Sequence, residues 1–296
     1  MQSFTYHAPR SVPEATQLLA SGDGNAVFLA GGTDILVQLR ENLRHASQVI
    51  DVKHISELNE LSMDGANGLV LGAAVTCNQF LNSPATESYT ALRDATQIIG
   101  GWQIQSRATI GGNLCNSSPA ADSVPALLAL GATVKFATSD GVQELPVSQF
   151  CTGPGKNVMH GKGLLIAIYI PPAGNQSGSA YQRFIPRYEM DIAVANAASY
   201  VELGKDGTVA EARIALGAVG PTAILADEAS AMLMSKLPNE EAIEAAARKA
   251  ATYAHPIDDM RGTIEFRQQL AYVMVKRTLQ TALRRAAGEV IVAHPH

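Results

Sequence analysis

The sequence predicts an α+β protein in which a mixed region, extending to about residue 177, precedes a small sheet backed by helices. Three observations predict this class. Short apolar runs of strand length alternate with amphipathic stretches as far as Pro171-Pro172. Residues Ala173–Gly178 are rich in Gly, Asn, Gln and Ser, which indicates a domain boundary. Beyond that boundary, strand-like runs are followed by two long amphipathic segments.

In the first part of the chain, the expected elements alternate between helix and strand. Ser11 is a suitable N-cap for a helix at Pro13–Ala20, because its hydroxyl can accept a hydrogen bond from the first turn. The other elements expected before residue 100 are strands at Ala26–Ala30, Gln48–Val52 and Gly68–Ala74, and helices at Ile35–Leu43 and Ala91–Ile99.

Glycines and prolines separate the later elements. Gly100-Gly101 should end a helix, and Thr109–Asn113 should form a tight turn. The other elements expected up to residue 172 are a helix at Pro125–Leu130, capped by Asp122 or Ser123, and strands at Ala132–Ala137 and Leu164–Ile170. Those expected after the boundary are strands at Ala180–Ile185, Ala193–Val201 and Val209–Leu216, a hairpin turn at Gly204–Gly207, and helices at Asn239–Tyr253 and Ile264–Ala287.

The expected domain organisation follows from these elements. Residues 1–177 would form one domain, with subdomains of about 1–55 and 56–177, and residues 178–288 a second. Residues 289–296 would be a loosely held tail. The last helix should bury Leu270, Val273, Met274 and Leu279 and turn its Arg and Lys side chains outward.

Composition excludes several classes of protein. The formal net charge is −5, aromatic residues make up 5%, and Lys and Arg do not cluster, so we expect no nucleic-acid partner. No apolar run reaches the roughly 18 residues of a membrane span, and the N-terminus does not resemble a signal peptide. Cys77, Cys115 and Cys151 are odd in number and far apart, which favours a reducing cytoplasm over a disulfide framework and makes a metal site or iron–sulfur cluster unexpected.

The first candidate site is a glycine pair, Gly31-Gly32, where an expected strand leads into an expected helix. Backbone N–H groups at a helix start bind anions, and glycine lets a pyrophosphate approach the main chain. Thr33 adds a hydroxyl donor. The alternative is an ordinary strand–helix turn capped by Asp34, since the segment is not the dinucleotide-binding G-x-G-x-x-G pattern.

The second candidate is Gly111-Gly112, again followed by short polar side chains and an expected helix. Alone it is equally ambiguous. Two such turns could divide a ligand between them, one holding a diphosphate and the other a ribityl chain or a ring. The residues by themselves leave a nucleotide-like ligand and a purely structural role both open.

Taken together, these segments resemble the FAD-binding subunit of the xanthine dehydrogenase family of molybdenum hydroxylases, which includes the medium subunits of carbon monoxide dehydrogenases. The resemblance covers nearly the whole chain and consists of several motifs in the family's order. They are Phe4–Pro9, Ala15–Leu19, Ala30–Asp34, Gly111–Asp122, Thr152–Lys156, Ile166–Pro171 and Arg187–Ala193. The resemblance implies the two-subdomain FAD-binding fold of vanillyl-alcohol-oxidase-type flavoproteins (the PCMH type), followed by a small sheet-and-helix domain.

The same resemblance implies a set of FAD contacts. Those around the diphosphate would be Leu29, Ala30, Gly31, Gly32, Thr33, Asp34, Ile35 and Leu36. Further cofactor contacts would come from Ile104, Ala108, Thr109, Gly111, Gly112 and Asn113. Asp122 would accept a hydrogen bond from a cofactor hydroxyl. The residues expected near the flavin ring are Cys115, Asn116, Leu164, Leu165, Arg183, Asp191 and Ile192.

Two of these residues have competing interpretations. Arg183 could stabilise negative charge on a reduced flavin and so raise its potential. For Arg183, as for Arg187 and Arg213, the alternative is solvation at the surface or pairing at a domain interface. Cys115 is interpreted as a packing residue, because no partner thiol is near in sequence.

The chain also departs from the family pattern. Trp102 and Gln105 stand in a stretch that in the family usually reads Gly-Pro-Gln-Ile-Arg, which could weaken a local ion pair or a contact to the adenine end. In contrast, the Gly-Gly-Thr-Asp turn and residues Thr152–Lys156 resemble the xanthine dehydrogenase branch more than the carbon monoxide branch.

The function that the resemblance implies is electron transfer. This chain would carry FAD beside a molybdopterin-binding large subunit and a 2Fe-2S small subunit, and would pass electrons to NAD+ or another acceptor. The alternatives are the same role in a carbon monoxide, aldehyde or N-heterocycle dehydrogenase, a stand-alone flavin oxidoreductase of the same fold, or a module that binds no FAD.

Overall fold

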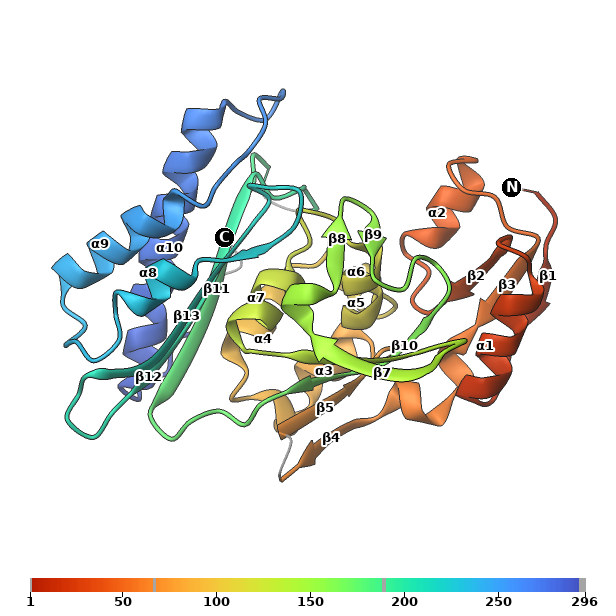
Figure 1. The fold of residues 1–296 in the computed structure, drawn as a ribbon, viewed down its shortest axis with the longest axis horizontal. Coiled ribbons are helices and arrows are strands. Elements are labelled where there is room, and N and C mark those ends of the chain that lie inside the picture. The colour runs from red at the N-terminus through yellow and green to blue at the C-terminus, as the bar shows by residue number, and fades with distance from the viewer. Residues whose placement is uncertain (1, 66–67, 188–189, 293–296) are drawn as a thin grey trace.

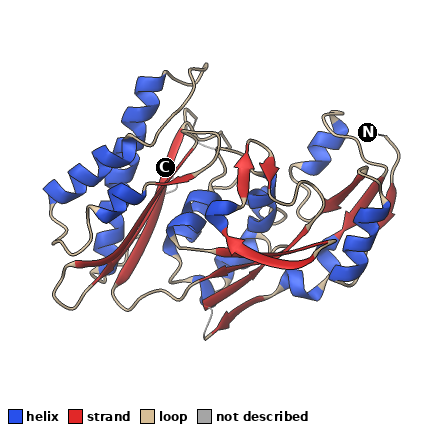
Figure 2. Cartoon of the chain, in the orientation of Figure 1, coloured by secondary structure: helices blue, strands red, loops and turns tan. Residues whose placement is uncertain are grey.

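The computed structural model describes residues 2–65, 68–187 and 190–292. Its elements form three layered regions that follow one another along the long axis of the molecule, from a small N-terminal sheet, through a central sheet with helices, to a C-terminal sheet covered by helices (Figure 1). Helices and strands are interspersed throughout (Figure 2), so the predicted α+β class is confirmed.

The N-terminal region is a parallel sheet in the order β1-β3-β2. Its elements are β1 (Thr5–His7), α1 (Val12–Ser21), β2 (Ala26–Leu29), α2 (Ile35–Arg40) and β3 (Gln48–Asp51). Helix α1 begins where predicted, because the Ser11 hydroxyl accepts a hydrogen bond from the Glu14 N–H and Pro13 occupies the first turn. The parallel pairing places the carboxyl ends of all three strands at one edge.

The central region is an antiparallel sheet in the order β4-β5-β10-β6-β7. Its strands are β4 (Leu61–Asp64), β5 (Gly68–Gly72), β6 (Thr133–Thr138), β7 (Gly141–Pro146) and β10 (Leu164–Ile170). Its helices are α3 (Cys77–Asn82), α4 (Thr90–Thr96), α5 (Trp102–Gln105), α6 (Ile110–Asn116) and α7 (Ser123–Ala129), and a small hairpin joins β8 (Cys151–Gly153) to β9 (Lys156–Asn157). Every residue of β5 is buried, so this sheet forms the middle of the largest hydrophobic core.

The C-terminal region is an antiparallel sheet in the order β11-β12-β13-β14. Its elements are β11 (Ser177–Phe184), β12 (Ala195–Leu203), β13 (Val209–Gly217), β14 (Ile224–Leu225), α8 (Asp227–Ala231), α9 (Glu240–Ala251) and α10 (Ile264–Ala286). Helix α10 packs on β11 and β12 from one side, and α4 and α7 of the central region contact the sheet from the other (Figure 1). The C-terminal sheet therefore lies between its own helices and those of the central region.

Several local expectations need correction. The segment Thr109–Asn113 is not a tight turn: Thr109 is the N-cap of α6, and its hydroxyl accepts a hydrogen bond from Gly112 N–H. Helix α2 ends at Arg40, short of the predicted Leu43, since Asn42 adopts a positive φ of 57°. The sequence did not predict the strands β1, β4, β7, β8, β9 and β14, the helices α3, α5 and α8, or the short 3-10 helices at Val52–His54, Ser56–Asn59, Pro84–Thr86 and Val147–Gln149.

Two charged side chains of α10 also differ from expectation. Arg267 and Arg285 lie inside the protein, with side chains 7% and 6% exposed, because each pairs with an aspartate. Of the predicted tail, residues 293–296 lie outside the described residues. Among the residues that are described, no helix is long and apolar enough to cross a membrane.

Candidate functional site

The turn that contains Gly31 is pressed against a distant segment of the chain. A Cβ on Gly31 would lie 2.2 Å from the carbonyl oxygen of Arg107 and 3.0 Å from the Cα of Ala108. Only glycine allows so close an approach of two backbones. Gly32 is needed for a second reason, since its φ of +81° lies in the left-handed region. The turn therefore has a conformation that other residues would not adopt without strain.

The second glycine pair lies in the first turn of α6. A Cβ on Gly111 would lie 2.6 Å from the carbonyl oxygen of Ala73, so this glycine brings α6 close to the backbone beside β5. Gly112 donates its N–H to the Thr109 hydroxyl at 2.9 Å. The Asn113 side chain accepts from the Ser123 hydroxyl at 2.6 Å, which ties α6 to the start of α7.

The two glycine turns come together, although 75 or more residues separate their motifs in sequence. Besides the Gly31–Arg107 contact, Asn116 at the end of α6 donates to the carboxylate of Asp34 at 3.3 Å. Asp34 begins α2 but does not cap it with its side chain. Burial raises the pKa of Asp34, while a hydrogen bond from Thr33 opposes that rise. The two segments thus form one backbone-lined surface with Asp34 and Asn116 between them.

A lysine behind the first turn fixes its position. Lys53 donates from Nζ to the Ala30 carbonyl at 3.2 Å and to Asp51 at 2.7 Å. Asp51 also accepts from the Tyr6 hydroxyl at 2.7 Å, so β1, β3 and the turn after β2 are linked at one edge of the sheet. Ligands of open sheets with parallel strands commonly bind beyond this edge.

A buried carboxylate joins the central region to the C-terminal sheet. Asp122 accepts from the Tyr181 hydroxyl at 2.6 Å and from Arg183 Nη1 at 2.7 Å. These two residues are two positions apart on β11, so their side chains point to the same face of the strand. Asp122 stands at the N-cap position of α7 without capping it, contrary to expectation, because both of its oxygens are engaged with β11.

Burial dominates the electrostatics of this cluster. It raises the pKa of Asp122 to about 6, although the Arg183 guanidinium and the Tyr181 hydroxyl both favour the carboxylate. The pKa of Tyr181 is raised well above its ordinary value, first by burial and then by Asp122. Arg183 has one orphaned buried atom, Nε, and the neighbouring Asn196 side chain reaches no hydrogen-bond partner although it is fully buried.

The other residues expected near a flavin ring have different environments. Leu164 and Leu165 are buried in the central core, on a strand that contacts α6. Cys115 is partly buried and packs against the same core; burial of its thiol, together with the nearby Cys151, raises the pKa of that thiol to about 12. Ile104 and Ala108 lie beside the second turn, Ile104 partly buried and Ala108 buried. Asp191 pairs with Arg187 at 3.2 Å.

A cavity of about 430 Å³ lies between the loop after α6 and the C-terminal domain. Its lining comes from Ser118–Ala120, from Ile192 before β12, from the segment that leads into α10, including His255–Ile257 and Arg261, and from Arg267 near the start of α10. Arg267 is buried and pairs with Asp259, and its Nε atom has no hydrogen-bond partner. The volume is within the range of small-molecule sites, and Ile192 is the one predicted site residue that lines it.

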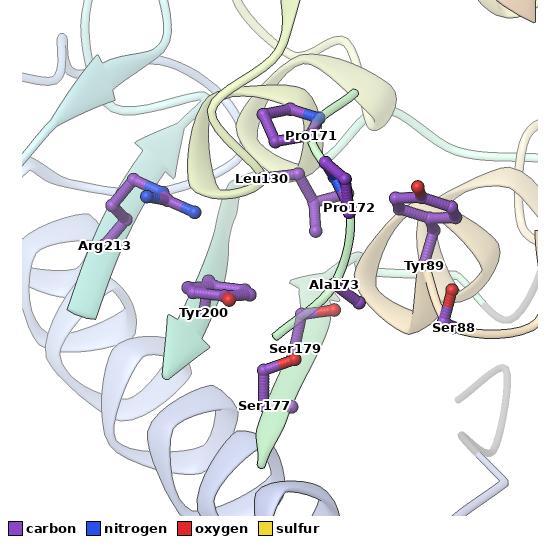
Figure 3. Close-up of a pocket in the computed structure, with 11 residues that line it drawn as sticks. Ser88, Tyr89, Leu130, Pro171, Pro172, Ala173, Ser177, Ser179, Tyr200 and Arg213 are labelled. Atoms are coloured by element: carbon purple, nitrogen blue, oxygen red, sulfur yellow. The ribbon is translucent and has the colours of Figure 1, made fainter. Parts of the chain in front are cut away.

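The structure shows the surroundings of the three arginines whose roles the sequence left open. Arg183 pairs with Asp122 across the domain interface, whereas Arg187 is mainly exposed at the surface. Arg213 donates from Nε to the Ala129 carbonyl at 2.6 Å and lies 4.4 Å above the ring of Tyr200. Figure 3 shows this part of the interface, where a space of about 10 Å³ beside Pro171 and Pro172 is too small for more than about one water.

Sequence reasoning missed several residues of this region. Tyr181 and Asn196 resemble ordinary strand residues in the sequence, and Asp122, the partner of the Tyr181 hydroxyl, is 59 residues away along the chain. Arg267 had a visible signal: it lies on the same stripe of α10 as Leu270 and Met274, where a charged residue needs a buried partner. His255 and Arg261 lie in a loop and carried no such signal.

Comparison with known families assigns both parts of the chain. Residues 2–173 match the FAD binding domain in molybdopterin dehydrogenase, and residues 179–282 match the CO dehydrogenase flavoprotein C-terminal domain. The chain belongs to the FAD-binding subunits of the molybdenum hydroxylase family. The family that the motifs resembled is thereby confirmed, and FAD is the cofactor.

Individual relatives of this FAD subunit match along almost their whole length. The xanthine dehydrogenase FAD-binding subunit of Escherichia coli O157:H7 is 31% identical over 97% of this chain and 98% of that protein. The carbon monoxide dehydrogenase medium chain of Hydrogenophaga pseudoflava is 32% identical over 96% and 98%.

Solved structures agree. A carbon monoxide dehydrogenase chain from Hydrogenophaga pseudoflava superposes with a TM-score of 0.91 at 31% identity, covering 96% of this chain and 98% of that one. A chain of quinoline 2-oxidoreductase from Pseudomonas putida 86 gives 0.88 at 29% identity, covering 96% and 98%. The predicted two-part fold, an FAD-binding domain followed by a C-terminal domain, is therefore confirmed.

The geometry of the FAD subunit fits its cofactor. A Cβ at Gly31 or Gly111 would collide with backbone, so these glycines let distant segments of main chain pack closely together. Both stand at or just before the start of a helix, where backbone N–H groups are of the kind that bind a diphosphate. The buried cluster at Asp122 offers charged and polar groups for the more polar part of a flavin, with an orphaned guanidinium atom on Arg183. The arrangement has main-chain groups of the kind that bind a phosphate and, at the interface between the two domains, a buried polar wall formed by Asp122, Tyr181 and Arg183.

Proposed function

We propose that this FAD subunit relays electrons between an iron–sulfur partner and a soluble acceptor, and that substrate oxidation takes place in another subunit. FAD supplies the ability to take electrons singly and to give up a pair as a hydride. The cavity of about 430 Å³ carries this proposal, because Ile192, a residue expected beside the flavin ring, lines it and an acceptor molecule could enter it from solvent.

The binding roles follow the geometry described above. The backbone of residues 30–34 and of Thr109–Asn113 would hold the diphosphate and adjoining groups of FAD, with Lys53 keeping the first turn in place. Asp122, Tyr181 and Arg183 would orient the ring end. Ile192, Leu164 and Leu165 would provide apolar contacts, Ile192 from the cavity side.

The charge of the cavity favours an anionic acceptor. Arg261 and Arg267 both pair with Asp259, which leaves one positive charge in excess among these three residues. NAD+ carries a pyrophosphate, so this wall would attract it. We therefore propose NAD+ as the acceptor, with another small acceptor as the alternative.

The partners are proposed from the family. Relatives are named as FAD-binding subunits or medium chains, which places them in larger enzymes. We propose that this chain assembles in the cytoplasm with a molybdopterin-binding large subunit and a 2Fe-2S small subunit. Identities of 31% and 32% to xanthine and carbon monoxide relatives do not separate substrates, but the Gly-Gly-Thr-Asp turn favours a xanthine-like heterocycle.

The test is to isolate the chain from its host with whatever assembles on it, assay molybdenum and iron, and add NADH without oxygen. We expect two partner chains, both metals, and loss of the visible absorbance of oxidised flavin. An Arg261→Gln variant should require more NADH for the same loss, whereas Arg248→Gln, a mainly exposed arginine on α9, should not. Flavin that dithionite bleaches but NADH does not would refute NAD+ as acceptor, and flavin without metal-containing partners would indicate a stand-alone flavoenzyme.

A further inference from the structure

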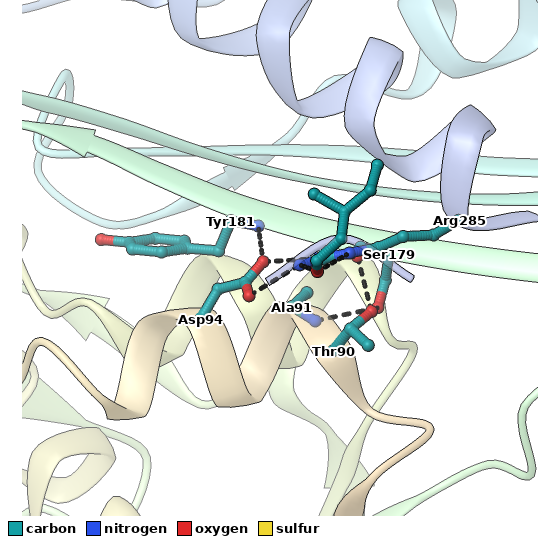
Figure 4. Close-up of polar contacts among 7 residues, drawn as sticks. Thr90, Ala91, Asp94, Ser179, Tyr181 and Arg285 are labelled. Atoms are coloured by element: carbon teal, nitrogen blue, oxygen red, sulfur yellow. Dashed lines mark hydrogen bonds and ion pairs between the residues drawn. The ribbon is translucent and has the colours of Figure 1, made fainter. Parts of the chain in front are cut away.

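The outer edge of β11 is closed by the central region. β11 is an edge strand of the C-terminal sheet, so one row of its backbone groups has no partner strand. The Ser179 carbonyl accepts from the Thr90 hydroxyl at 2.6 Å, and the Tyr181 N–H donates to Asp94 at 3.1 Å. Both acceptor and donor groups of the strand are thus satisfied by α4 (Figure 4).

A buried ion pair strengthens this contact. Arg285, in the last turn of α10, donates from Nη1 and Nη2 to the two oxygens of Asp94 at 2.6 and 3.0 Å, and Nη1 also reaches the Ser179 carbonyl at 2.6 Å. The two side chains are 6% and 7% exposed. Burial raises the pKa of Asp94, although the guanidinium opposes this. Figure 4 shows α4, β11 and the end of α10 meeting at this pair.

The same strand carries Tyr181 and Arg183, two of the three residues of the polar wall. Tyr181 is held at both ends, by its N–H on Asp94 and by its hydroxyl on Asp122. Arg183 follows two residues later on the same face and completes the contact to Asp122. A displacement of β11 along α4 would move Tyr181 and Arg183 together relative to Asp122.

We propose that Asp94 and Arg285 are positioning residues for the flavin site, acting through Arg183. They fix β11 against α4 so that the guanidinium of Arg183 meets Asp122 at the wall beside the cofactor. This inference rests on the assignment of Asp122 and Arg183 to the FAD site in the proposed function. Neither Asp94 nor Arg285 touches the cofactor in this proposal.

The test is a double-mutant cycle on the full chain, with FAD affinity and the visible circular dichroism of bound flavin as readouts. Asp94→Asn keeps an acceptor for the Tyr181 N–H but removes the charge that Arg285 needs. We expect both Asp94→Asn and Arg183→Gln to weaken FAD binding about tenfold and to change the dichroism. In the Arg183→Gln background, Asp94→Asn should have little further effect. If Asp94→Asn does not fold, Arg285→Lys takes its place in the cycle, because it keeps the positive charge but loses the two-point contact to Asp94.

A buried control separates positioning from stability. Thr278→Val removes the 2.8 Å hydrogen bond between Thr278 and Ser199, which joins α10 to β12 away from α4. It should lower the midpoint of thermal unfolding and leave FAD affinity and dichroism unchanged. If Asp94→Asn behaves like this control, or if its effect on affinity persists fully in the Arg183→Gln background, the positioning role is refuted. If Arg183→Gln itself leaves FAD binding unchanged, the site assignment beneath the proposal is refuted instead.

Discussion

Replacing Gly31 by alanine should disrupt the FAD cradle without removing any polar group. The added Cβ would lie 2.2 Å from the Arg107 carbonyl oxygen, where an ordinary contact needs about 3.4 Å or more. The two segments would have to separate by about 1 Å. Both are backbone, so no flexible side chain can yield.

The expected magnitude follows from this overlap. Overpacking of this kind costs about 1–3 kcal/mol. Because 1.4 kcal/mol corresponds to a tenfold change in an equilibrium constant, we expect Gly31→Ala to weaken FAD binding by about tenfold or more and to lower the free energy of unfolding. Gly111→Ala, with its Cβ 2.6 Å from the Ala73 carbonyl, should act in the same direction.

The assay is a titration of the FAD-free chain by FAD fluorescence, paired with urea denaturation. Gly153→Ala is the matched control, because a Cβ there meets nothing within 4 Å and its φ is not positive. It should leave both measurements unchanged. If Gly31→Ala binds FAD as the wild type does, or if Gly153→Ala is equally impaired, the argument from backbone approach is wrong.

Three further outcomes are expected. The pKa of Asp122 in the folded chain is about 6, above its ordinary value of 3.8. Its contribution to the free energy of unfolding should therefore fall by about 3 kcal/mol as the pH rises from below 3.8 to above 6. Urea denaturation at about pH 4 and pH 7 should show most of this loss in the wild type relative to Asp122→Asn. Thr109→Ala should cost about 1 kcal/mol of stability by removing the N-cap of α6, and Thr109→Ser should restore most of it; an unchanged Thr109→Ala chain would contradict the cap. Cys77 and Cys115, whose pKa values are raised to about 12 by burial, should resist alkylation at neutral pH in the folded chain, as mass spectrometry of iodoacetamide-treated protein would show; rapid modification of either would contradict its packing role.

The glycine turns could be proposed from the sequence because each pattern lies within a few consecutive residues. Gly31-Gly32 and Gly111-Gly112 each stand between an apolar run and a polar helix start, and that pattern is visible within ten residues. The sequence alone still left a structural role equally open. The contact between Gly31 and Arg107 and the positive φ of Gly32 explain why the first turn needs glycine, and both are seen only in the folded chain.

The polar wall could not be predicted in the same way. Asp122 and Arg183 are 61 residues apart, and no periodicity in either segment indicates their pairing. The interpretation of Asp122 as a helix cap was locally reasonable but wrong, because a buried carboxylate gains more from a guanidinium and a phenol than from the first turn of α7. The cavity beside Ile192 depends on loops from both domains and carried no sequence signal beyond Arg267.

The ion pair between Asp94 and Arg285 has a consequence for biosynthesis. Its partners are separated by 191 residues, so the carboxylate is made long before the guanidinium that neutralises it. While the chain is on the ribosome, α4 would carry this aspartate without the guanidinium that neutralises it. This ion pair can form only after residue 285 has left the exit tunnel. The junction of α4, β11 and α10 is therefore completed only at the end of synthesis, when the last turn of α10 reaches the carboxylate made 191 residues earlier.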